Sequence, residues 1–446
     1  MNSNDRAIVA FTMIGHSMFH LYELAIPLFV VYWLVAFDVS AAVIGTLVGG
    51  GLALIGVGAV VSGVLADEYG SKTLVTTSIL GMGGSFLLIG VSPRLEVLAL
   101  ALLAWGAASS LYHPAALSLL TRGTEEQGTA LAYHGAAGNV GTAVGPFVAA
   151  ILLTFVRWEG VAISFVVPAA VAVAIAFRFD FDETAGVDQP VEGSIGGAPD
   201  GDPGVGSDGD PDGSAADMST DGSGATAPTT DGVTDISGFL AQSRHLFTGG
   251  FVVAFAIMMV HGLYARGVLS FLPEILARLP LFAPIPIGEE SFEPSQYVFA
   301  GLLLLGAGGQ YVGGKLTDRT RTEYALIGTY AVIALASLAF LPASNAGIVP
   351  MLVVCGALGT TIYMSAPIRQ ALLAEYSTAD VRGLSFGYFY LGVYGVGAIG
   401  TSLAGIVLTY GSTGAFFVVF AAIATVAILL GWLLLRGFTN GERSGQ

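Results

Sequence analysis

The chain has 446 residues, of which 54% are hydrophobic and only 11% are charged. With a mean hydropathy of +0.76, this composition excludes a soluble protein and indicates a polytopic membrane protein. Of the 32 acidic residues behind the net charge of −16, 14 lie between Asp180 and Asp235, and the other 18 nearly balance the 16 basic residues. The single cysteine, Cys355, excludes a disulfide framework and a cysteine metal site within one chain.

Twelve apolar segments each have about the 20 residues that a helix needs to cross the hydrocarbon core of a membrane. The first begins near Ile8, is too long for a signal-peptide core and has no cleavage pattern after it, so we expect it to be retained. The fold class is therefore an all-α polytopic membrane protein with 12 transmembrane helices. The predicted spans are 8–36, 41–65, 73–92, 95–121, 127–156, 160–178, 248–275, 293–316, 324–342, 347–375, 383–410 and 413–436.

A short polar stretch occurs twice and indicates a duplication. Gly63 to Lys72 follows the second segment and Gly314 to Glu323 follows the eighth, with Gly, Leu and Asp at matching places and an offset of 251 residues. Each copy is expected to be a tight turn between two membrane helices. His16 and His261 are a further matching pair, at an offset of 245. The twelve helices are therefore predicted to form two six-helix pseudo-repeats.

Three parts follow from this duplication: an N-terminal six-helix bundle (1–179), a linker (180–236) and a C-terminal six-helix bundle (237–446). The linker is rich in Gly, Asp, Ser, Thr and Pro and cannot build a core, so it is predicted to be disordered and cytoplasmic. We expect a solvated tether, with a regulatory role as the alternative. Twelve aspartates in the linker and two lysines in the whole chain suit a halophile's salty cytoplasm, although GC-rich coding also favours Arg over Lys.

The basic residues predict the orientation. An even number of spans puts both termini on one side, and that side holds eleven basic residues against three on the other, so we expect the termini in the cytoplasm and the chain in the plasma membrane. The eleven are Arg6, Lys72, Arg122, Arg178, Arg244, Lys315, Arg319, Arg321, Arg382, Arg436 and Arg443, and the three are Arg94, Arg157 and Arg278.

The repeated turn resembles the loop signature Gly-x-Leu-x-Asp-x-x-Gly-x-Lys/Arg of the major facilitator superfamily, and the layout of six plus six helices is similar over nearly the whole chain. Within that superfamily, Phe19 to Pro27 (FHLYELAIP) and Tyr112-His113-Pro114 are similar to the fosmidomycin-resistance group of efflux proteins. The resemblance implies two bundles that rock about a solute site near the midplane of the membrane.

The turn is expected to act as a gate. Gly63 would allow close approach of a neighbouring helix, and Asp67 would precede a helix start, where a carboxylate bonds free amides and latches the cytoplasmic face. Glu68 stands where the family pattern has Arg, which appears only in the second copy, so a turn that merely sets topology is the alternative. The other residues of this gating motif are Gly70, Lys72, Gly314, Asp318 and Arg319.

A second motif lies in the fifth span. Gly141, Gly145 and Pro146 are similar to the signature of proton-linked drug antiporters, but Ala149 and Ala150 replace the expected glycine pair. Glycines thin a helix and Pro removes a backbone bond, so close helix packing without any bearing on transport is the alternative.

Five of the six histidines lie in predicted spans, where ionisable groups are rare and mark function. His16, His20 and Glu23 follow an i, i+4, i+7 spacing, which puts them within about 60° on one helix face. We expect this face to look inward and to accept and release protons. The other histidines in spans are His113, His134 and His261.

His113 and His134 are expected at one depth, either as a hydrogen-bonded structural pair or as a pair that handles substrate or protons. No third ligand is spaced near them, so no metal site is expected. Arg266 lies at the depth of Glu23 in the opposite half and needs a partner, so the two are predicted to pair. Arg369 is expected either to extend to the membrane interface or to bind solute.

We expect a secondary active transporter that exports a small organic molecule in exchange for protons by alternating access. The alternatives are a proton-coupled importer of an organic anion, suggested by Arg266 and Arg369, and a transport-inactive sensor. An intramembrane enzyme is disfavoured because metal-protease and serine-hydrolase patterns are absent, and no nucleotide-binding loop occurs. The expected partners are solute, protons and the bilayer, with no cofactor and no nucleic acid, and a monomer is expected to suffice.

Overall fold

The structure is a computed structural model that describes residues 1–186, 247, 249–288, 290–376 and 387–437. Most of the predicted linker, 180–236, therefore lies outside the described residues. The same holds for the start of the predicted span 383–410.

The N-terminal half consists of six membrane crossings, two of which are built from two helices each. The fourth crossing is interrupted at Leu111, next to the Tyr112-His113-Pro114 sequence, and the sixth is interrupted at Phe165. Pro114 and Pro168 each follow a break by three residues, so each proline lies in the first turn of its helix, where a missing amide hydrogen is tolerated. The helices are α1 (Ser3–Ala36), α2 (Ala41–Tyr69), α3 (Ser71–Gly90), α4 (Leu95–Ser110), α5 (Tyr112–Gly123), α6 (Gln127–Phe155), α7 (Trp158–Ser164) and α8 (Val166–Ala176).

The C-terminal half repeats this plan and adds a small hairpin that was not predicted. Strands β1 (Ile285–Ile287) and β2 (Glu290–Phe292) pair antiparallel, and Gly288, at a φ of 68°, turns the chain between them. The eleventh crossing contains a π-helical stretch. The elements are α10 (Gly249–Ala277), η1 (Pro280–Phe282), α11 (Pro294–Thr317), α12 (Thr322–Ala346), α13 (Ile348–Glu375), η3 (Leu391–Val396), α15 (Ala398–Tyr410) and α16 (Thr413–Gly437).

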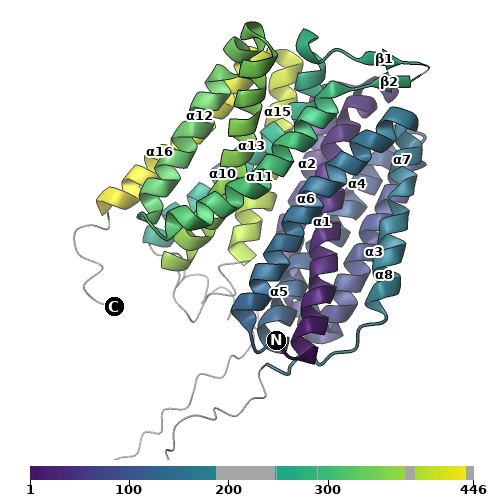
Figure 1. Cartoon of the computed structure of the whole chain (residues 1–446), viewed down its shortest axis with the longest axis vertical. Coiled ribbons are helices and arrows are strands. Elements are labelled where there is room, and N and C mark those ends of the chain that lie inside the picture. The colour runs from purple at the N-terminus through teal and green to yellow at the C-terminus, as the bar shows by residue number, and fades with distance from the viewer. Residues whose placement is uncertain (187–246, 248, 289, 377–386, 438–446) are drawn as a thin grey trace, which may run out of the picture.

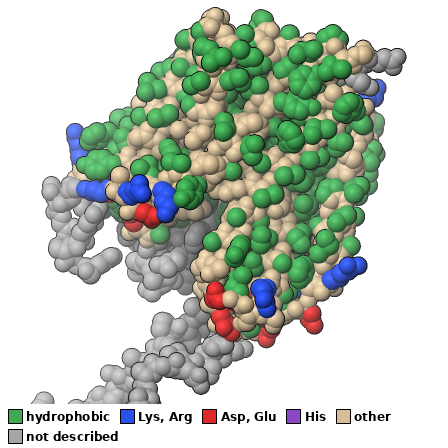
Figure 2. Space-filling view, in the orientation of Figure 1, with side chains coloured by type: hydrophobic (Ala, Val, Ile, Leu, Met, Phe, Trp, Pro, Cys, Tyr) green, Lys and Arg blue, Asp and Glu red, His purple; other side chains and the backbone are tan. Residues whose placement is uncertain are grey.

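The helices have the length and the surface of membrane spans. Eleven helical stretches in the described residues are long and apolar enough to cross a bilayer, and α11 is the twelfth crossing. Apolar side chains cover the sides of the molecule, whereas most charged side chains gather at its ends (Figure 2). Large apolar residues such as Leu100 point outward, which is expected where lipid replaces water as the solvent. The predicted all-α polytopic fold is confirmed.

We name the two ends of the molecule by their features. The terminal face carries the start of α1 and the ends of α5, α8 and α16, and the hairpin face carries β1 and β2 (Figure 1). The halves pack together through α2 on α15, α1 on α10 and α6 on α11. Near the hairpin face, the Ala42 amide donates to Thr409 Oγ1 (2.9 Å) and Gln296 donates to the Tyr32 hydroxyl (2.7 Å). Toward the terminal face the helices of the halves diverge (Figure 1).

Candidate functional site

The first copy of the repeated motif is mostly helix rather than turn. No Gly or Pro occurs between Gly63 and Gly70, so α2 continues to Tyr69 and the chain reverses at Gly70, whose φ is 82°. Two predictions are therefore wrong. A side chain at Gly63 would meet nothing within 4 Å, so this glycine permits no close approach. Asp67 lies in the last turn of α2, not before a helix start, and accepts a hydrogen bond from exposed Arg122 of α5 at 2.6 Å.

The carboxylate that caps α3 comes from the other end of the N-terminal half. Glu183 accepts hydrogen bonds from the backbone amides of Ser71 (2.8 Å) and Lys72 (3.1 Å). Lys72 Nζ in turn donates to the Phe179 carbonyl at 2.5 Å. A negative charge at a helix N-terminus satisfies free amides and the helix dipole. The described start of the predicted linker is thus fixed on the terminal face, where Lys72 of the motif holds it.

We expect Glu183→Ala to lower the free energy of unfolding by about 1 kcal/mol, because the free amides at the start of α3 lose their acceptor. Thermal unfolding in detergent measures this change. Asp180→Ala is the matched control, since it removes the same charge from an exposed side chain three residues away. Equal unfolding midpoints for the two variants would contradict the capping role.

The second copy of the motif differs from the first. Gly314 lies inside α11, and a side chain there would meet nothing within 4 Å. Asp318 is at the C-terminal end of α11, and Arg319 follows it in the connection to α12. The inequivalence that Glu68 and Arg319 suggested in the sequence therefore extends to the local structure.

A hydrogen-bonded chain of polar groups runs along one face of α1. His16 Nδ1 lies 2.7 Å from the carbonyl oxygen of His134 on α6. His16 Nε2 lies 3.1 Å from His20 Nε2, and His20 Nδ1 lies 2.8 Å from Glu23 Oε2. The predicted polar face of the first helix is therefore present, and it points into the protein. The side chain of His20 is 21% exposed, whereas that of Glu23 is 3% exposed.

The hydrogen-bonded chain of His16, His20 and Glu23 can hold one extra proton. Its three hydrogen bonds need three hydrogens, because the His134 carbonyl can only accept. Neutral His16 and His20 supply one hydrogen each, and an ionised Glu23 supplies none. All three bonds are therefore made only when His16, His20 or Glu23 carries one additional proton. Loss of that proton would leave two acceptors facing each other and break one link.

Glycines in α6 allow this chain to form. A Cβ at Gly138 would lie 2.5 Å from the His16 ring, and one at Gly141 would lie 2.2 Å from the Ser17 carbonyl oxygen. Any side chain at these positions would push α6 away from α1 and separate His16 from its acceptor. Gly145 packs in the same way against Leu21, and Pro146 is buried in α6. The close helix packing at the antiporter-like motif is therefore present, and whether the motif also bears on antiport stays a prediction.

His113 and His134 lie on either side of His16. The His134 ring stacks on His16 with 4.0 Å between ring centroids, and His113 meets His16 edge-on at 5.3 Å. Nδ1 of His113 and Nδ1 of His134 are both buried without a hydrogen-bond partner. The predicted direct pair is therefore replaced by a cluster around a third imidazole. Sequence spacing missed this because His16 comes from another helix.

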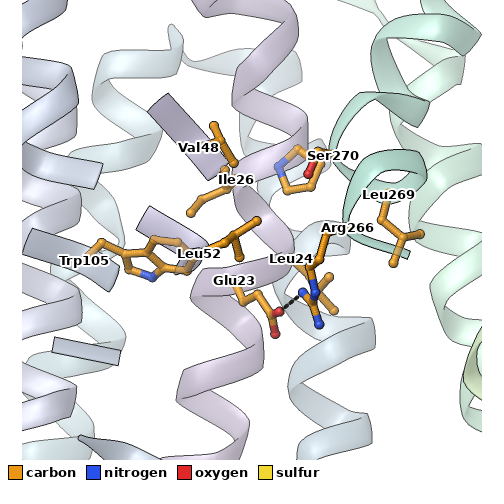
Figure 3. A pocket seen from close by; sticks show the side chains of 10 residues that line it. Glu23, Leu24, Ile26, Val48, Leu52, Trp105, Arg266, Leu269 and Ser270 are labelled. Carbon is orange, nitrogen blue, oxygen red and sulfur yellow. Dashed lines mark hydrogen bonds and ion pairs between the residues drawn. The ribbon is translucent and has the colours of Figure 1, made fainter. Parts of the chain in front are cut away.

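Glu23 pairs with Arg266 across the two halves, as predicted. Arg266 Nη1 donates to Glu23 Oε1 (Figure 3). The guanidinium also lies over the Tyr394 ring, 4.1 Å from its centroid. A small cavity of about 20 Å³ adjoins the pair and is lined by Trp105 and Ser270 among others. The cavity has room for about one water molecule, and the side chains of Glu23 and Arg266 are 3% and 15% exposed, so the pair is largely buried. The first and seventh crossings thus meet through opposite charges.

His261 points away from this contact. Its Nδ1 lies 2.9 Å from the Tyr330 hydroxyl of α12 and 3.3 Å from Ser365 Oγ of α13. Helix α10 is continuous, so His261 and Arg266 face different sides, as their spacing requires. His261, which matches His16 in the duplication, therefore contacts side chains of its own half.

Arg369 is buried, with 3% of its surface exposed, so the prediction that it extends to the membrane interface is wrong. Its Nε lies 3.5 Å from Ser365 Oγ, its Nη1 lies 3.8 Å from Met258 Sδ, and the guanidinium is 5.6 Å from the Phe389 ring centroid. Among the described residues, no carboxylate forms an ion pair with it. A buried cation without a counter-charge is costly, which is characteristic of a binding residue.

Twelve membrane crossings in two halves, with charged groups buried between them, define a polytopic membrane transporter. The family model described as Major Facilitator Superfamily matches residues 8–367, and the chain belongs to this superfamily. The predicted family is confirmed, and it is a family of transporters rather than enzymes.

Similar proteins agree with this assignment. The puromycin resistance protein pur8 of Streptomyces alboniger is 36% identical over 117 residues, which is 26% of this chain and 22% of that relative's length. A bacterial homologue of the human lysosomal transporter Spinster, in an inward-facing and unoccupied conformation, has a TM-score of 0.70 at 14% identity, with 98% of each chain covered. The nucleoside transporter NupG has a TM-score of 0.69 at 12% identity, with 96% of this chain and 100% of NupG covered.

Proposed function

We propose that this protein is a secondary active transporter of the plasma membrane that exports a small organic molecule in exchange for protons by alternating access. The observation that supports this most strongly is the hydrogen-bonded chain from His16 through His20 to Glu23, which ends on Arg266 of the opposite half. This hydrogen-bonded chain connects imidazoles that can take up a proton with the Glu23–Arg266 contact between the two halves. We propose that transport needs one chain only, since every member of this site lies in a single protomer.

Coupling follows from the count of hydrogens. With the extra proton present, His20 donates to Glu23 Oε2 and Arg266 donates to Oε1, so both carboxylate oxygens are satisfied. When the proton leaves, neutral His20 keeps one hydrogen, which its Nδ1 donates to the Glu23 carboxylate, and the two Nε2 atoms of His16 and His20 then face each other as acceptors. The bond to Glu23 now comes from a neutral imidazole rather than from an imidazolium and is weaker, so Glu23 is held less firmly against Arg266. Proton release would thereby favour separation at the hairpin face.

The orientation completes the cycle. We propose that the terminal face is cytoplasmic, because eleven of the basic residues belong to that side by sequence. The halves pack together near the hairpin face and diverge toward the terminal face (Figure 1), so this conformation would be the one that faces the cytoplasm. A protonated network in this state fits exchange. A proton then enters from outside and is released to the cytoplasm before the solute leaves the cell.

Import of an organic anion together with protons is the second candidate, and Arg369 supports it. Arg369, Arg266 and Glu23 together carry a net charge of +1, and the extra proton of the chain raises it to +2. This charge favours an anionic solute in either direction of transport. The name of the relative pur8 states resistance to puromycin, and this favours export by the present chain only by analogy.

Direction is measured with whole cells. We expect that cells producing this protein tolerate at least one toxic compound of a panel that includes fosmidomycin and puromycin, and that they accumulate less of it than control cells. Dissipating the pH gradient with a protonophore should abolish the difference. Higher accumulation in producing cells would favour the importer, and no effect of the protonophore would exclude proton coupling.

A further inference from the structure

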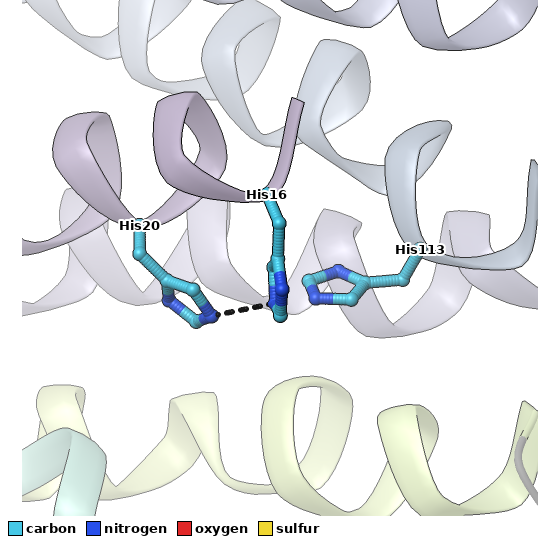
Figure 4. A group of neighbouring side chains, drawn as sticks. All are labelled: His16, His20 and His113. Atoms are coloured by element: carbon cyan, nitrogen blue, oxygen red, sulfur yellow. Dashed lines mark hydrogen bonds between the residues drawn. The ribbon is translucent and has the colours of Figure 1, made fainter. Parts of the chain in front are cut away.

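The histidine cluster has the features of a transition-metal site. Three imidazoles, from His16, His20 and His113, offer ligand nitrogens that all lie within 4.8 Å of one another (Figure 4). His16 and His20 come from α1 and His113 from α5, and the three rings point toward one another. The sequence argued against a metal because no third ligand was spaced near His113 and His134. The fold supplies that ligand from the first helix.

The distances suit a tetrahedral ion. Zinc binds histidine nitrogen at about 2.0–2.1 Å, so two ligands of a tetrahedral zinc lie about 3.3 Å apart. His16 Nε2 and His20 Nε2 are 3.1 Å apart. His113 would have to move closer by up to about 1.5 Å, and no hydrogen bond at its Nδ1 opposes that movement because this atom has no partner.

The outer nitrogens of His16 and His20 are already held as metal ligands require. A histidine that binds a metal donates its other ring N–H to a carboxylate or a backbone carbonyl, which fixes the tautomer and the ring. His16 Nδ1 faces the His134 carbonyl at 2.7 Å, and His20 Nδ1 faces the Glu23 carboxylate at 2.8 Å. Both Nε2 atoms are therefore directed at the space between the rings, where an ion would bind.

The cluster also has a path from outside and a counter-charge. The side chain of His20 is 21% exposed, whereas His113 is 5% exposed, so an ion would enter past His20 and become enclosed at His113. Glu23 offsets part of the ion's charge through His20. We propose that His16, His20 and His113 bind one divalent transition-metal ion such as Zn²⁺, with the fourth position open to water. Imidazole ligands favour zinc, copper and nickel over magnesium and calcium.

The test is calorimetric titration of the full-length protein in lipid nanodiscs with Zn²⁺, which does not depend on the proposed transport cycle. We expect one tight site per chain, and no comparable site for Mg²⁺. His113→Gln and His16→Gln should each weaken binding on the order of 100-fold, since a site of three ligands loses one. His261→Gln removes a histidine that lies outside the cluster, within the C-terminal half, and should leave the affinity for Zn²⁺ unchanged.

His113→Cys separates ligation from a structural role. A thiolate also binds zinc, so this variant should recover most of the affinity that His113→Gln loses, which a packing role would not produce. Equal affinity in the parent, His16→Gln and His113→Gln would overturn the proposal, as would the absence of a tight Zn²⁺ site. Size-exclusion profiles of the variants show whether each is folded.

Discussion

Glu23→Gln is expected to abolish transport driven by a pH gradient while leaving exchange of solute between the two sides of a vesicle. Gln has the shape of Glu but cannot hold the carboxylate charge, so a proton on His16 or His20 loses its counter-charge and its link through Glu23 to Arg266. Reconstituted vesicles with an imposed pH gradient measure the first activity, and counterflow of labelled solute without a gradient measures the second.

Glu23→Gln is also expected to change the stability of the protein, which a second substitution can separate from coupling. Removing one partner of a buried ion pair costs about 3–5 kcal/mol because the other charge stays buried, so Glu23→Gln is expected to lower thermal stability. Adding Arg266→Gln removes that charge and should restore stability without restoring coupling. Glu274→Gln is the matched control, because Glu274 is also a buried carboxylate of the interior that pairs with an arginine, Arg278, outside the hydrogen-bonded chain.

Two results would contradict the role of Glu23. Coupling that survives in Glu23→Gln would remove this residue from the proton pathway. Loss of counterflow to the same degree as gradient-driven transport would show that the residue supports solute binding or movement in general, rather than proton coupling.

Features that depend on a single helix could be predicted from the sequence. The faces of α1 and α10 follow from the helical period, so the polar face of His16, His20 and Glu23 was expected and found, and the same period accounts for the different directions of His261 and Arg266. The depth of a residue in the membrane can be counted along its helix, since every span starts at a membrane interface. That is why the pairing of Glu23 with Arg266 could be predicted from residues 243 apart.

The sequence failed where contacts between helices decide. Nothing in the motif shows that α2 continues past Asp67 or that Glu183, 112 residues away, takes the capping place at Ser71. The order of rings around His16 depends on how closely α6 approaches α1, and this closeness is set by Gly138 and its neighbours. These glycines are the one signal that sequence reasoning had available, because small residues face close contacts in lipid.

The burial of Arg369 gives a prediction in which stability and function change in opposite directions. This guanidinium is 3% exposed, and in the described part of the chain it contacts only a hydroxyl, a thioether and an aromatic ring. A charge placed there lowers stability unless a solute supplies the counter-charge. Arg369→Gln is therefore expected to leave the thermal midpoint of the solute-free protein unchanged or higher.

Solute binding should change the other way. If an anionic group of the solute pairs with Arg369, its loss leaves that group buried without a partner, which costs about 2–5 kcal/mol, or about 30- to 5,000-fold in affinity. Arg369→Lys keeps the charge but not the planar fork, so it should fall between the parent and Arg369→Gln. Arg278→Gln is the control, because Arg278 is half exposed near the hairpin face. Unchanged solute affinity in Arg369→Gln together with a lower thermal midpoint would make Arg369 a structural residue, and the case for an anionic solute would then rest on Arg266 alone.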